Sequence, residues 1–277
     1  MVAESSAGGV YRPKLPELEF VRYRVEERIA CITLDRPDKL NAITDQVVRE
    51  VRQAFQHFDL DPEAFVGILH GAGRAFTSGA DVRQRQMRSA EEMQAFGPAA
   101  PENRRRDLFF DCVNWKPMIA AVHGYALGMG VSLALQCDLV VAAASTRFQI
   151  TETGRGLNPA TLWSLLRFRA TSTFADEVCL TGRMFTAEEA LAAGAITRAV
   201  PEGEHLDVAL EMARELLKNP PLAVRAVVRT RRQYLLDHQR QSFLLAEASP
   251  ALHLSRDFQE AAKAFVEKRP PPRFEGR

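Results

Sequence analysis

The chain has 277 residues, enough for one large domain or for one domain with a smaller appendage. Its 46% apolar and 26% charged residues are ordinary for a globular protein, and a net charge of +1 gives no strong basic field for nucleic acid or an anionic membrane. No run approaches the roughly 20 apolar residues of a membrane span, and the N-terminus lacks the apolar core of a signal peptide. The four cysteines form no C-x-x-C pair, so we expect a cytoplasmic protein with free thiols.

The first two thirds of the chain alternate strand-like and helix-like segments. Residues 1–16 are small, polar and proline-containing, which is typical of a loose tail. Thr44 is placed to cap a helix over residues 45–58, where apolar side chains recur every three or four positions. Extended or apolar segments that we predict to be strands lie at 18–25, 29–37, 65–71, 116–124 and 139–146. Each strand is followed by a helix-like stretch, which predicts an α/β domain over residues 17–200.

Two later regions differ from this alternation. Residues 83–107 are polar and contain two prolines, which fits either mobile helices and loops over a site or a solvated surface excursion. Residues 201–277 contain amphipathic helical stretches and few strand signals. We predict helices within 204–219, 221–237 and 238–254, and a last one from residue 258 that Pro270 to Pro272 stop. The apolar faces of such a unit often bury against another subunit.

Two glycine-rich turns are candidate ligand sites. "GAGRAFTSGADV" (71–82) and "GYALGMGVSLAL" (124–135) each follow a predicted strand. Glycines let a ligand approach backbone N–H groups closely, and a helix starting near Gly130 would leave its first N–H groups unpaired. Together the turns can offer one N–H each to a single oxygen, as an oxyanion hole does; ligand-free strand-to-helix turns are the alternative. A dinucleotide loop of a Rossmann oxidoreductase is a weak match, because Leu133 stands at the third glycine position of "GMGVSL".

The pairing of "GAGRAFTSGADV" with "AAVHGYALGMGVSLALQCDLVVAAASTRF" resembles the crotonase superfamily of enoyl-CoA hydratases and isomerases. Residues 32–43, 180–204 and 265–274 are similar to further segments of that family, so the resemblance spans about residues 18–274. It implies an α/β, crotonase-like spiral of ββα units over 17–200, followed by a helical trimerisation region over 201–277. It also implies a homotrimer or a dimer of trimers that acts on acyl-CoA thioesters, with no metal and no tightly bound cofactor.

The resemblance assigns roles to four residues. The backbone N–H groups of Ala80 and Met129 would hold the thioester oxygen and stabilise an enolate, at about 3 kcal/mol per donor. Hydratases of the family carry two glutamates; here Ser132 stands at the first position and Glu152 at the second. Partial desolvation would raise the pKa of Glu152 and suit proton transfer near neutral pH. One base fits Δ3–Δ2 enoyl-CoA isomerisation at least as well as hydration, while Ser132 can hold a water but is a poor base.

The resemblance also implies contacts to CoA, and two other functions compete with the leading one. The implied CoA contacts are Lys39, Leu40, Ala42, Ser78, Ala80, Asp81, Val82, Phe265 and Lys268, the last two often from another subunit. A serine with the second glutamate kept also resembles the feruloyl-CoA hydratase-lyases, but their C-terminal tyrosine has no counterpart here, where Phe243 stands. A catalytically weak acyl-CoA-binding paralogue is the other alternative.

Overall fold

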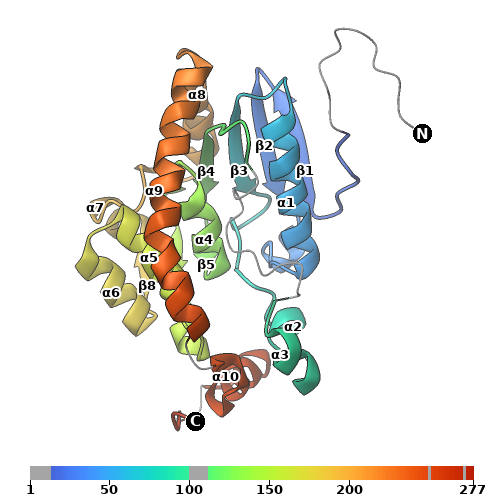
Figure 1. The fold of residues 1–277 in the computed structure, drawn as a ribbon, viewed down its shortest axis with the longest axis vertical. Helices are drawn as coiled ribbons and strands as arrows, with labels where there is room; N and C mark the ends of the chain where they lie inside the picture. The colour runs from blue at the N-terminus through green and yellow to red at the C-terminus, as the bar shows by residue number, and fades with distance from the viewer. Residues whose placement is uncertain (1–13, 100–111, 249–250, 271–272) are drawn as a thin grey trace.

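Two sheets and a helical C-terminal region make up the described part of the chain (Figure 1). The computed structural model describes residues 14–99, 112–248, 251–270 and 273–277, so most of the predicted N-terminal tail and Pro271 and Pro272 lie outside it. The larger sheet has the order β1-β2-β3-β4-β6-β9, and its strands are β1 (Val21–Glu26), β2 (Ile29–Leu34), β3 (Val66–Gly71), β4 (Met118–Val122), β6 (Leu139–Ala143) and β9 (Arg198–Val200). β1 pairs with β2 in antiparallel fashion, and the other neighbours in this sheet are parallel.

A smaller sheet is built from three short strands. Its strands are β5 (Tyr125–Leu127), β7 (Arg147–Gln149) and β8 (Met184–Thr186), in the order β5-β7-β8. The chain therefore passes between the sheets at β4 to β5, β6 to β7 and β8 to β9, which is the spiral that the resemblance implied. Gly124 makes the first passage possible, because its φ of 60° suits glycine and a Cβ there would lie 2.1 Å from the Arg74 carbonyl oxygen.

The helices cover the sheets and extend the C-terminal region. They are α1 (Asp45–Leu60), α2 (Val82–Arg85), α3 (Ala90–Phe96), α4 (Met129–Gln136), α5 (Ala160–Arg169), α6 (Ser172–Thr181), α7 (Ala187–Ala192), α8 (His205–Leu217), α9 (Pro221–Ala248) and α10 (Arg256–Val266). Short 3-10 helices are η1 (Pro37–Lys39), η3 (Thr153–Arg155) and η4 (Leu252–Leu254). α8 covers one face of the larger sheet, where Ala209 and Ala213 pack with Ile68 and Ile119. Leu69, the next residue along β3, points to the other face and joins the main core, as strand alternation requires.

The predicted elements are largely confirmed, with two corrections. All five predicted strands are present, and the Thr44 hydroxyl caps α1 by accepting from the Val47 N–H at 3.2 Å. The helices predicted at 221–237 and 238–254 are wrong as separate units, because α9 runs unbroken over 28 residues. No glycine or proline lies between Leu222 and Ala248 to end it. The expectation of a helix after every strand also fails at β1, β4 and β6, each of which leads directly to another strand.

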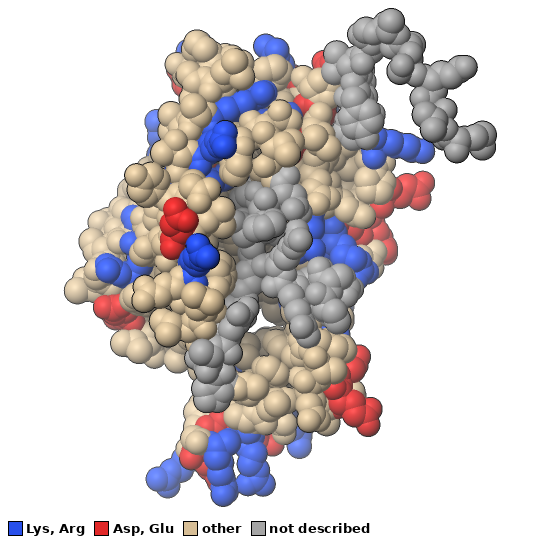
Figure 2. All heavy atoms as spheres, in the orientation of Figure 1, with Lys and Arg blue, Asp and Glu red and all other residues tan. Residues whose placement is uncertain are grey.

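The surface carries charges of both signs. On the face in Figure 2, Lys and Arg side chains and Asp and Glu side chains both occur among large neutral areas, in keeping with a net charge of +1. None of the helices in the described ranges combines the length and the low polarity that a membrane span needs.

Candidate active site

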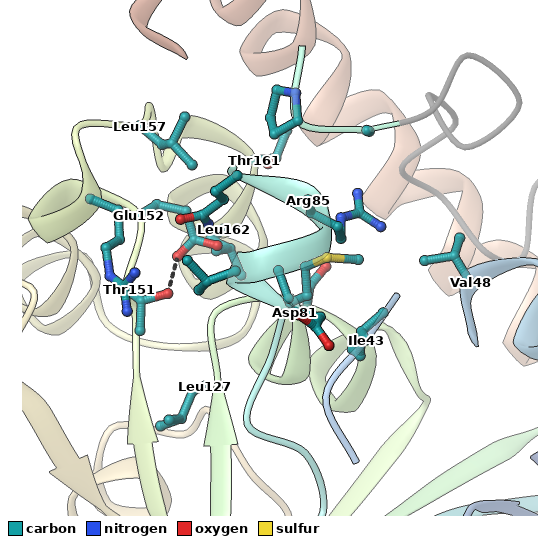
Figure 3. Close-up of a pocket in the computed structure, with 18 of the residues that line it drawn as sticks. Ile43, Val48, Asp81, Arg85, Leu127, Thr151, Glu152, Leu157, Thr161 and Leu162 are labelled. Carbon is teal, nitrogen blue, oxygen red and sulfur yellow. Dashed lines mark hydrogen bonds between the residues drawn. The ribbon is translucent and has the colours of Figure 1, made fainter. Parts of the chain in front are cut away.

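One large cavity gathers the residues that the sequence singled out (Figure 3). It encloses about 2060 Å³, and α1, α2, α4, α5, α9 and α10 all contribute to its wall. This volume exceeds the ~300–1,000 Å³ typical of pockets for drug-sized molecules, so the cavity has room for a longer ligand. All twelve predicted site residues lie on this wall: Lys39, Leu40, Ala42, Ser78, Ala80, Asp81, Val82, Met129, Ser132, Glu152, Phe265 and Lys268.

The first glycine turn presents the Ala80 N–H toward the cavity. Ile43 pairs with this turn: its N–H donates to the Gly79 oxygen at 2.8 Å, and its carbonyl accepts from the Asp81 N–H at 2.9 Å. Because polar groups alternate along an extended segment, the N–H of Ala80 faces away from Ile43. Among the described residues it donates no hydrogen bond.

The second glycine turn lies directly against the first. The Thr77 N–H donates to the Tyr125 oxygen at 2.9 Å, and the Leu127 N–H donates to the Thr77 oxygen at 3.2 Å. A Cβ on Gly79 would lie 2.3 Å from the Leu127 oxygen and 3.7 Å from the Met129 nitrogen. A side chain at position 79 would therefore collide with the second turn, so the close approach of the two turns requires glycine there.

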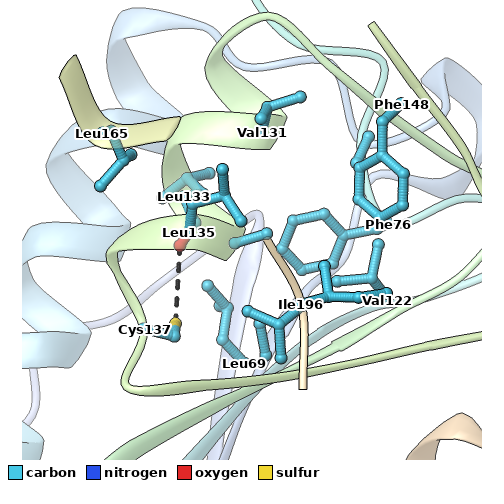
Figure 4. Close-up of a cluster of buried hydrophobic side chains, with 14 of the residues drawn as sticks. Leu69, Phe76, Val122, Val131, Leu133, Leu135, Cys137, Phe148, Leu165 and Ile196 are labelled. Atoms are coloured by element: carbon cyan, nitrogen blue, oxygen red, sulfur yellow. Dashed lines mark hydrogen bonds between the residues drawn. The ribbon is translucent and has the colours of Figure 1, made fainter. Parts of the chain in front are cut away.

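Helix α4 aims its N-terminus into the cavity. It begins at Met129, whose N–H has no acceptor among the described residues and carries the partial positive charge of a helix start. Buried side chains hold the helix in place, since Val131 and Leu135 pack in the same cluster as Phe76 and Phe148 (Figure 4). The predicted helix start near Gly130 is confirmed.

Glu152 stands where β7 gives way to η3, with its carboxyl against the second glycine turn. A Cβ on Gly128 would lie 3.1 Å from Oε1 of Glu152, so the carboxyl is next to the residue that precedes Met129. The Thr151 hydroxyl is 3.5 Å from Oε2 of Glu152, and this contact is drawn in Figure 3. Burial raises the pKa of Glu152 to about 7, and hydrogen bonds and the nearby Arg155 oppose that rise without cancelling it.

Ser132 has a partner that the sequence analysis did not identify. Its hydroxyl accepts a hydrogen bond from Nε2 of Gln136 at 2.8 Å. Both residues line the cavity, and only 6% of Gln136 is exposed. Two residues that stand four positions apart on a helix lie on the same face, so contact between Ser132 and Gln136 could have been predicted from the sequence. The position that holds a glutamate in two-carboxylate hydratases is thus occupied by a neutral hydroxyl and amide.

Asp81 organises the first turn. Its carboxylate accepts from the Gln84 N–H at 3.2 Å, which caps α2, and pairs with Nη1 of Arg36 at 2.9 Å. Ser78 is fixed to the other implied CoA segment, because its N–H donates to the Leu40 oxygen at 2.9 Å. The two stretches that the resemblance assigned to CoA therefore form one continuous part of the wall.

Helix α10 brings Phe265 and Lys268 to the cavity of their own chain. The guanidinium of Arg155 lies 3.7 Å from the centre of the Phe265 ring, and α10 contacts η3 and α2. Both residues line the cavity within this chain, and the expectation that they reach the site of another subunit stays a prediction. Arg155 was not predicted from the sequence, although it lies only three residues after Glu152.

The polar segment 83–107 contributes to the wall through its first part. The lining residues from this part are Arg83 and Gln84 of α2, Gln86 directly after α2, and Phe96 of α3. Residues 100–107 lie outside the described residues. Phe243 of α9, which lies in the stretch that the resemblance compared with the tyrosine of the lyases, also lines the cavity.

Comparison with known proteins finds relatives that span most of the chain. The sequence pattern of the enoyl-CoA hydratase/isomerase family matches residues 24–277. The chain is 30% identical over 264 residues to a short-chain-enoyl-CoA hydratase of Clostridium acetobutylicum, covering 94% of this chain and 100% of that one. It is 36% identical to a carnitinyl-CoA dehydratase of Shigella flexneri, covering 87% and 92%. A solved carnitinyl-CoA dehydratase of Mycobacterium avium superposes with a TM-score of 0.77 at 30% identity, covering 93% and 99%.

Proposed function

Because this chain belongs to the enoyl-CoA hydratase/isomerase family, we propose that it adds water to the double bond of a 2-enoyl-CoA thioester, or removes it from a 3-hydroxyacyl-CoA. Glu152 moves the proton, and the Ala80 and Met129 N–H groups hold the thioester oxygen. The observation that carries the proposal is the desolvated Glu152 carboxyl beside Gly128, next to a helix N-terminus with a free donor.

The proposed steps need one carboxyl. Glu152 in its carboxylate form takes a proton from water as the water oxygen bonds to C3 of the substrate. The electron pair of the double bond moves toward the thioester, and the resulting enolate oxygen accepts from the Ala80 and Met129 N–H groups. Glu152, now protonated, returns the proton to C2 and becomes a carboxylate again. A pKa of about 7 supports both directions of transfer, because both forms are populated near neutral pH.

Isomerisation of a 3-enoyl-CoA is the second candidate, and the Ser132–Gln136 pair favours it. The hydroxyl of Ser132 accepts from the Gln136 amide at 2.8 Å, so no second carboxylate activates a water at that position. A single carboxyl that takes a proton from one carbon and returns it to another completes an isomerisation. We do not propose the hydratase-lyase reaction, since Phe243 has no hydroxyl and Tyr234, 69% exposed, is not among the described residues on the wall.

Product analysis in heavy-oxygen water tests these functions. The protein and its Glu152→Gln variant are incubated with 2-enoyl- and 3-enoyl-CoA panels, and the products are analysed by mass spectrometry. Heavy oxygen in a 3-hydroxyacyl product of the wild type, lost in the variant, supports the hydratase. A moved double bond without gained oxygen supports the isomerase. No conversion in either panel contradicts both and leaves an acyl-CoA-binding paralogue.

The proposal also covers the substrates, the cofactor requirement and the location of the enzyme. Acyl-CoA thioesters are its substrates, and no tightly bound cofactor takes part in the steps above. All four cysteines are free thiols, which supports the cytoplasmic location expected from the sequence.

A further inference from the structure

Two polar side chains follow one another along the part of α4 that faces the cavity. Ser132 and Gln136 stand four residues apart on this helix, and both line the cavity. Another side of α4 is held in the hydrophobic core by Val131 and Leu135 (Figure 4). This packing fixes the rotation of the helix about its axis, and with it the face that Ser132 and Gln136 present to the cavity.

Gln136 is a buried amide that acts on Ser132. Only 6% of Gln136 is exposed, and its Nε2 atom donates to Oγ of Ser132 at 2.8 Å. A helical side chain leans toward the N-terminus of its helix, so Gln136 reaches back by one turn. The donated hydrogen bond occupies one of the two lone pairs of the hydroxyl and leaves its proton free to be donated elsewhere.

The hydroxyl proton of Ser132 is donated to no atom in the described part of the chain. A helical serine can donate to the carbonyl oxygen four residues before it. Here that oxygen belongs to Gly128, and it already accepts from the Val131 and Ser132 N–H groups at 3.0 and 3.3 Å. Ser132 is only partly buried and lines the cavity, so a ligand there can accept its proton in a hydrogen bond.

Ser132 lies close to the place of the proposed chemistry. Helix α4 begins at Met129, whose N–H would hold the thioester oxygen, and Ser132 is three residues, or about 4.5 Å along the axis, further on. The side chain of Ser132 leans back toward this helix start. The Glu152 carboxyl lies against Gly128, the residue before Met129. Because C3 of the acyl group is two bonds from the thioester carbon, an oxygen on C3 would lie near the first turn of α4.

We infer that Gln136 is a positioning residue that directs the Ser132 hydroxyl to donate a hydrogen bond to the oxygen on C3 of the acyl group. That oxygen is the attacking water in hydration and the departing hydroxyl in dehydration. Ser132 keeps its proton throughout, and Glu152 carries the proton that is transferred. The inference rests on the proposed function, because the positions of the thioester and of the C3 oxygen come from it. The pair supplies no base, but its donor has a use only in hydration, since a 3-enoyl-CoA has no oxygen on C3.

Two saturated esters of equal chain length test this donor without turnover. 3-Hydroxybutanoyl-CoA carries the C3 oxygen, and butanoyl-CoA lacks it. Both are titrated by calorimetry into Glu152→Gln, which lacks the base and so does not dehydrate the hydroxy ester. We expect the hydroxy ester to bind about threefold to tenfold more tightly, the worth of one neutral hydrogen bond. Ser132→Ala added to Glu152→Gln should abolish this preference, and Gln136→Met added to it should lower the preference, because the hydroxyl can then turn away from the ligand.

Gln239→Met is the matched control. Gln239 of α9 is also 6% exposed and also lines the cavity, but its Nε2 atom donates to the Thr161 oxygen at 3.4 Å. Its replacement removes an equally buried amide without changing the hydrogen bond to Ser132, so the preference should stay. A Gln136→Met variant that loses the same factor with both esters would reduce Gln136 to a packing role and overturn the inference. An equal loss of the preference in Gln239→Met would overturn it as well.

Gln136→Glu, again added to Glu152→Gln, tests the direction of the hydrogen bond. A neutral carboxyl still has a proton to donate to Ser132, whereas a carboxylate can only accept. Since burial raises the pKa of Glu152 only to about 7, we expect a carboxyl at position 136 to be ionised at pH 9. The preference for the hydroxy ester should therefore be present at pH 5 and lost at pH 9, while Glu152→Gln alone keeps it at both. A preference that is constant or rises with pH would overturn the inference, because residue 136 would then not need to donate.

Conversion of trans-2-butenoyl-CoA by the wild type separates this inference from the proposed function. A preference for the hydroxy ester that depends on Gln136, without any conversion of the enoyl ester, would support the donor and reject the proposed reaction. Hydration of the enoyl ester together with equal binding of the two saturated esters would support the reaction and reject the donor.

Discussion

The carboxyl of Glu152 has to exist in two protonation states for the proposed chemistry. Burial raises its pKa from an ordinary 4.5 to about 7. As the base of the hydration direction it must be ionised, so we expect kcat/KM for a 2-enoyl-CoA to rise as pH increases through about 7. A pH–rate profile of the wild type checks this, and a profile that is flat between pH 5 and 8 would remove Glu152 from that role.

The same shift has a consequence for stability. The folded protein binds the Glu152 proton more tightly than the unfolded chain does, so this contribution is full below pH 4.5 and is lost as pH rises through about 7. Above that pH the wild type holds a buried charge at a cost of up to about 3 kcal/mol, which neutral glutamine avoids. We therefore expect Glu152→Gln to have nearly wild-type stability at pH 5 and a higher free energy of unfolding at pH 8.

Urea unfolding at the two pH values measures this difference. Glu188→Gln, at an exposed position of α7, is the matched control and should show the same difference from wild type at both. If Glu152→Gln were less stable than the wild type at pH 8, its carboxylate would be a stabilising group and the desolvation argument would be wrong.

At the scale of elements, the start of α4 is the most constrained part of the site. Gly128 has φ 48° and ψ −111°, and a Cβ there would lie 2.6 Å from the Thr151 hydroxyl and 3.1 Å from Oε1 of Glu152. We expect Gly128→Ala to displace the carboxyl, to lower kcat by more than about tenfold, and to cost about 1–3 kcal/mol of stability through backbone strain.

Gly154 provides the comparison for this substitution. It lies in η3, two residues after Glu152, and a Cβ on it would meet nothing within 4 Å. Gly154→Ala should therefore retain activity and stability. Steady-state kinetics and thermal unfolding of both variants check the pair. Equal losses in the two would mean that η3 and not the turn at Gly128 controls the carboxyl.

The sequence predicted secondary structure well where a strand was long enough to show an apolar run. The apolar runs at 65–71, 116–124 and 139–146 indicated β3, β4 and β6, because strands covered on both faces need side chains of one kind throughout. β5, β7, β8 and β9 have three residues each, which is too short for a period of two to be recognised. The twelve residues that share this cavity were predicted from the resemblance, since no spacing alone predicts that residues 42 and 265 line the same cavity.

Contacts between distant elements were not predictable in the same way. Gln136 lies four residues from Ser132 on α4, so that pair was within reach of helix periodicity. Arg85 and Asp45 are forty positions apart, and only the placement of α2 against α1 brings them together. The division at residue 200 marks a change of pattern, yet α8 beyond it packs against the larger sheet in one apolar cluster, so residues on both sides of the division are buried together.

At the scale of the whole molecule, α9 carries apolar side chains that nothing in the described part of the chain covers. Val227 and Tyr234 are each 69% exposed and stand seven residues apart, which places them on one face of the helix. Large exposed apolar side chains in such a row are typical of subunit interfaces. We expect a second and third copy of the chain to cover them, giving a trimer or a dimer of trimers in solution.

Sedimentation of the wild type and of the double variant Val227→Asp, Tyr234→Asp tests this assembly. Two carboxylates on the covered face would each lose solvent without a partner, so the variant should sediment as a smaller species. Leu180→Asp is the control, because Leu180 is 76% exposed but lies on α6, away from this row, and should leave the assembly intact. A monomeric wild type would contradict the expectation outright, whereas an assembled double variant would exclude this face of α9 as the contact. Since residues of α10 line the cavity of their own chain, we expect a monomeric variant still to bind acyl-CoA.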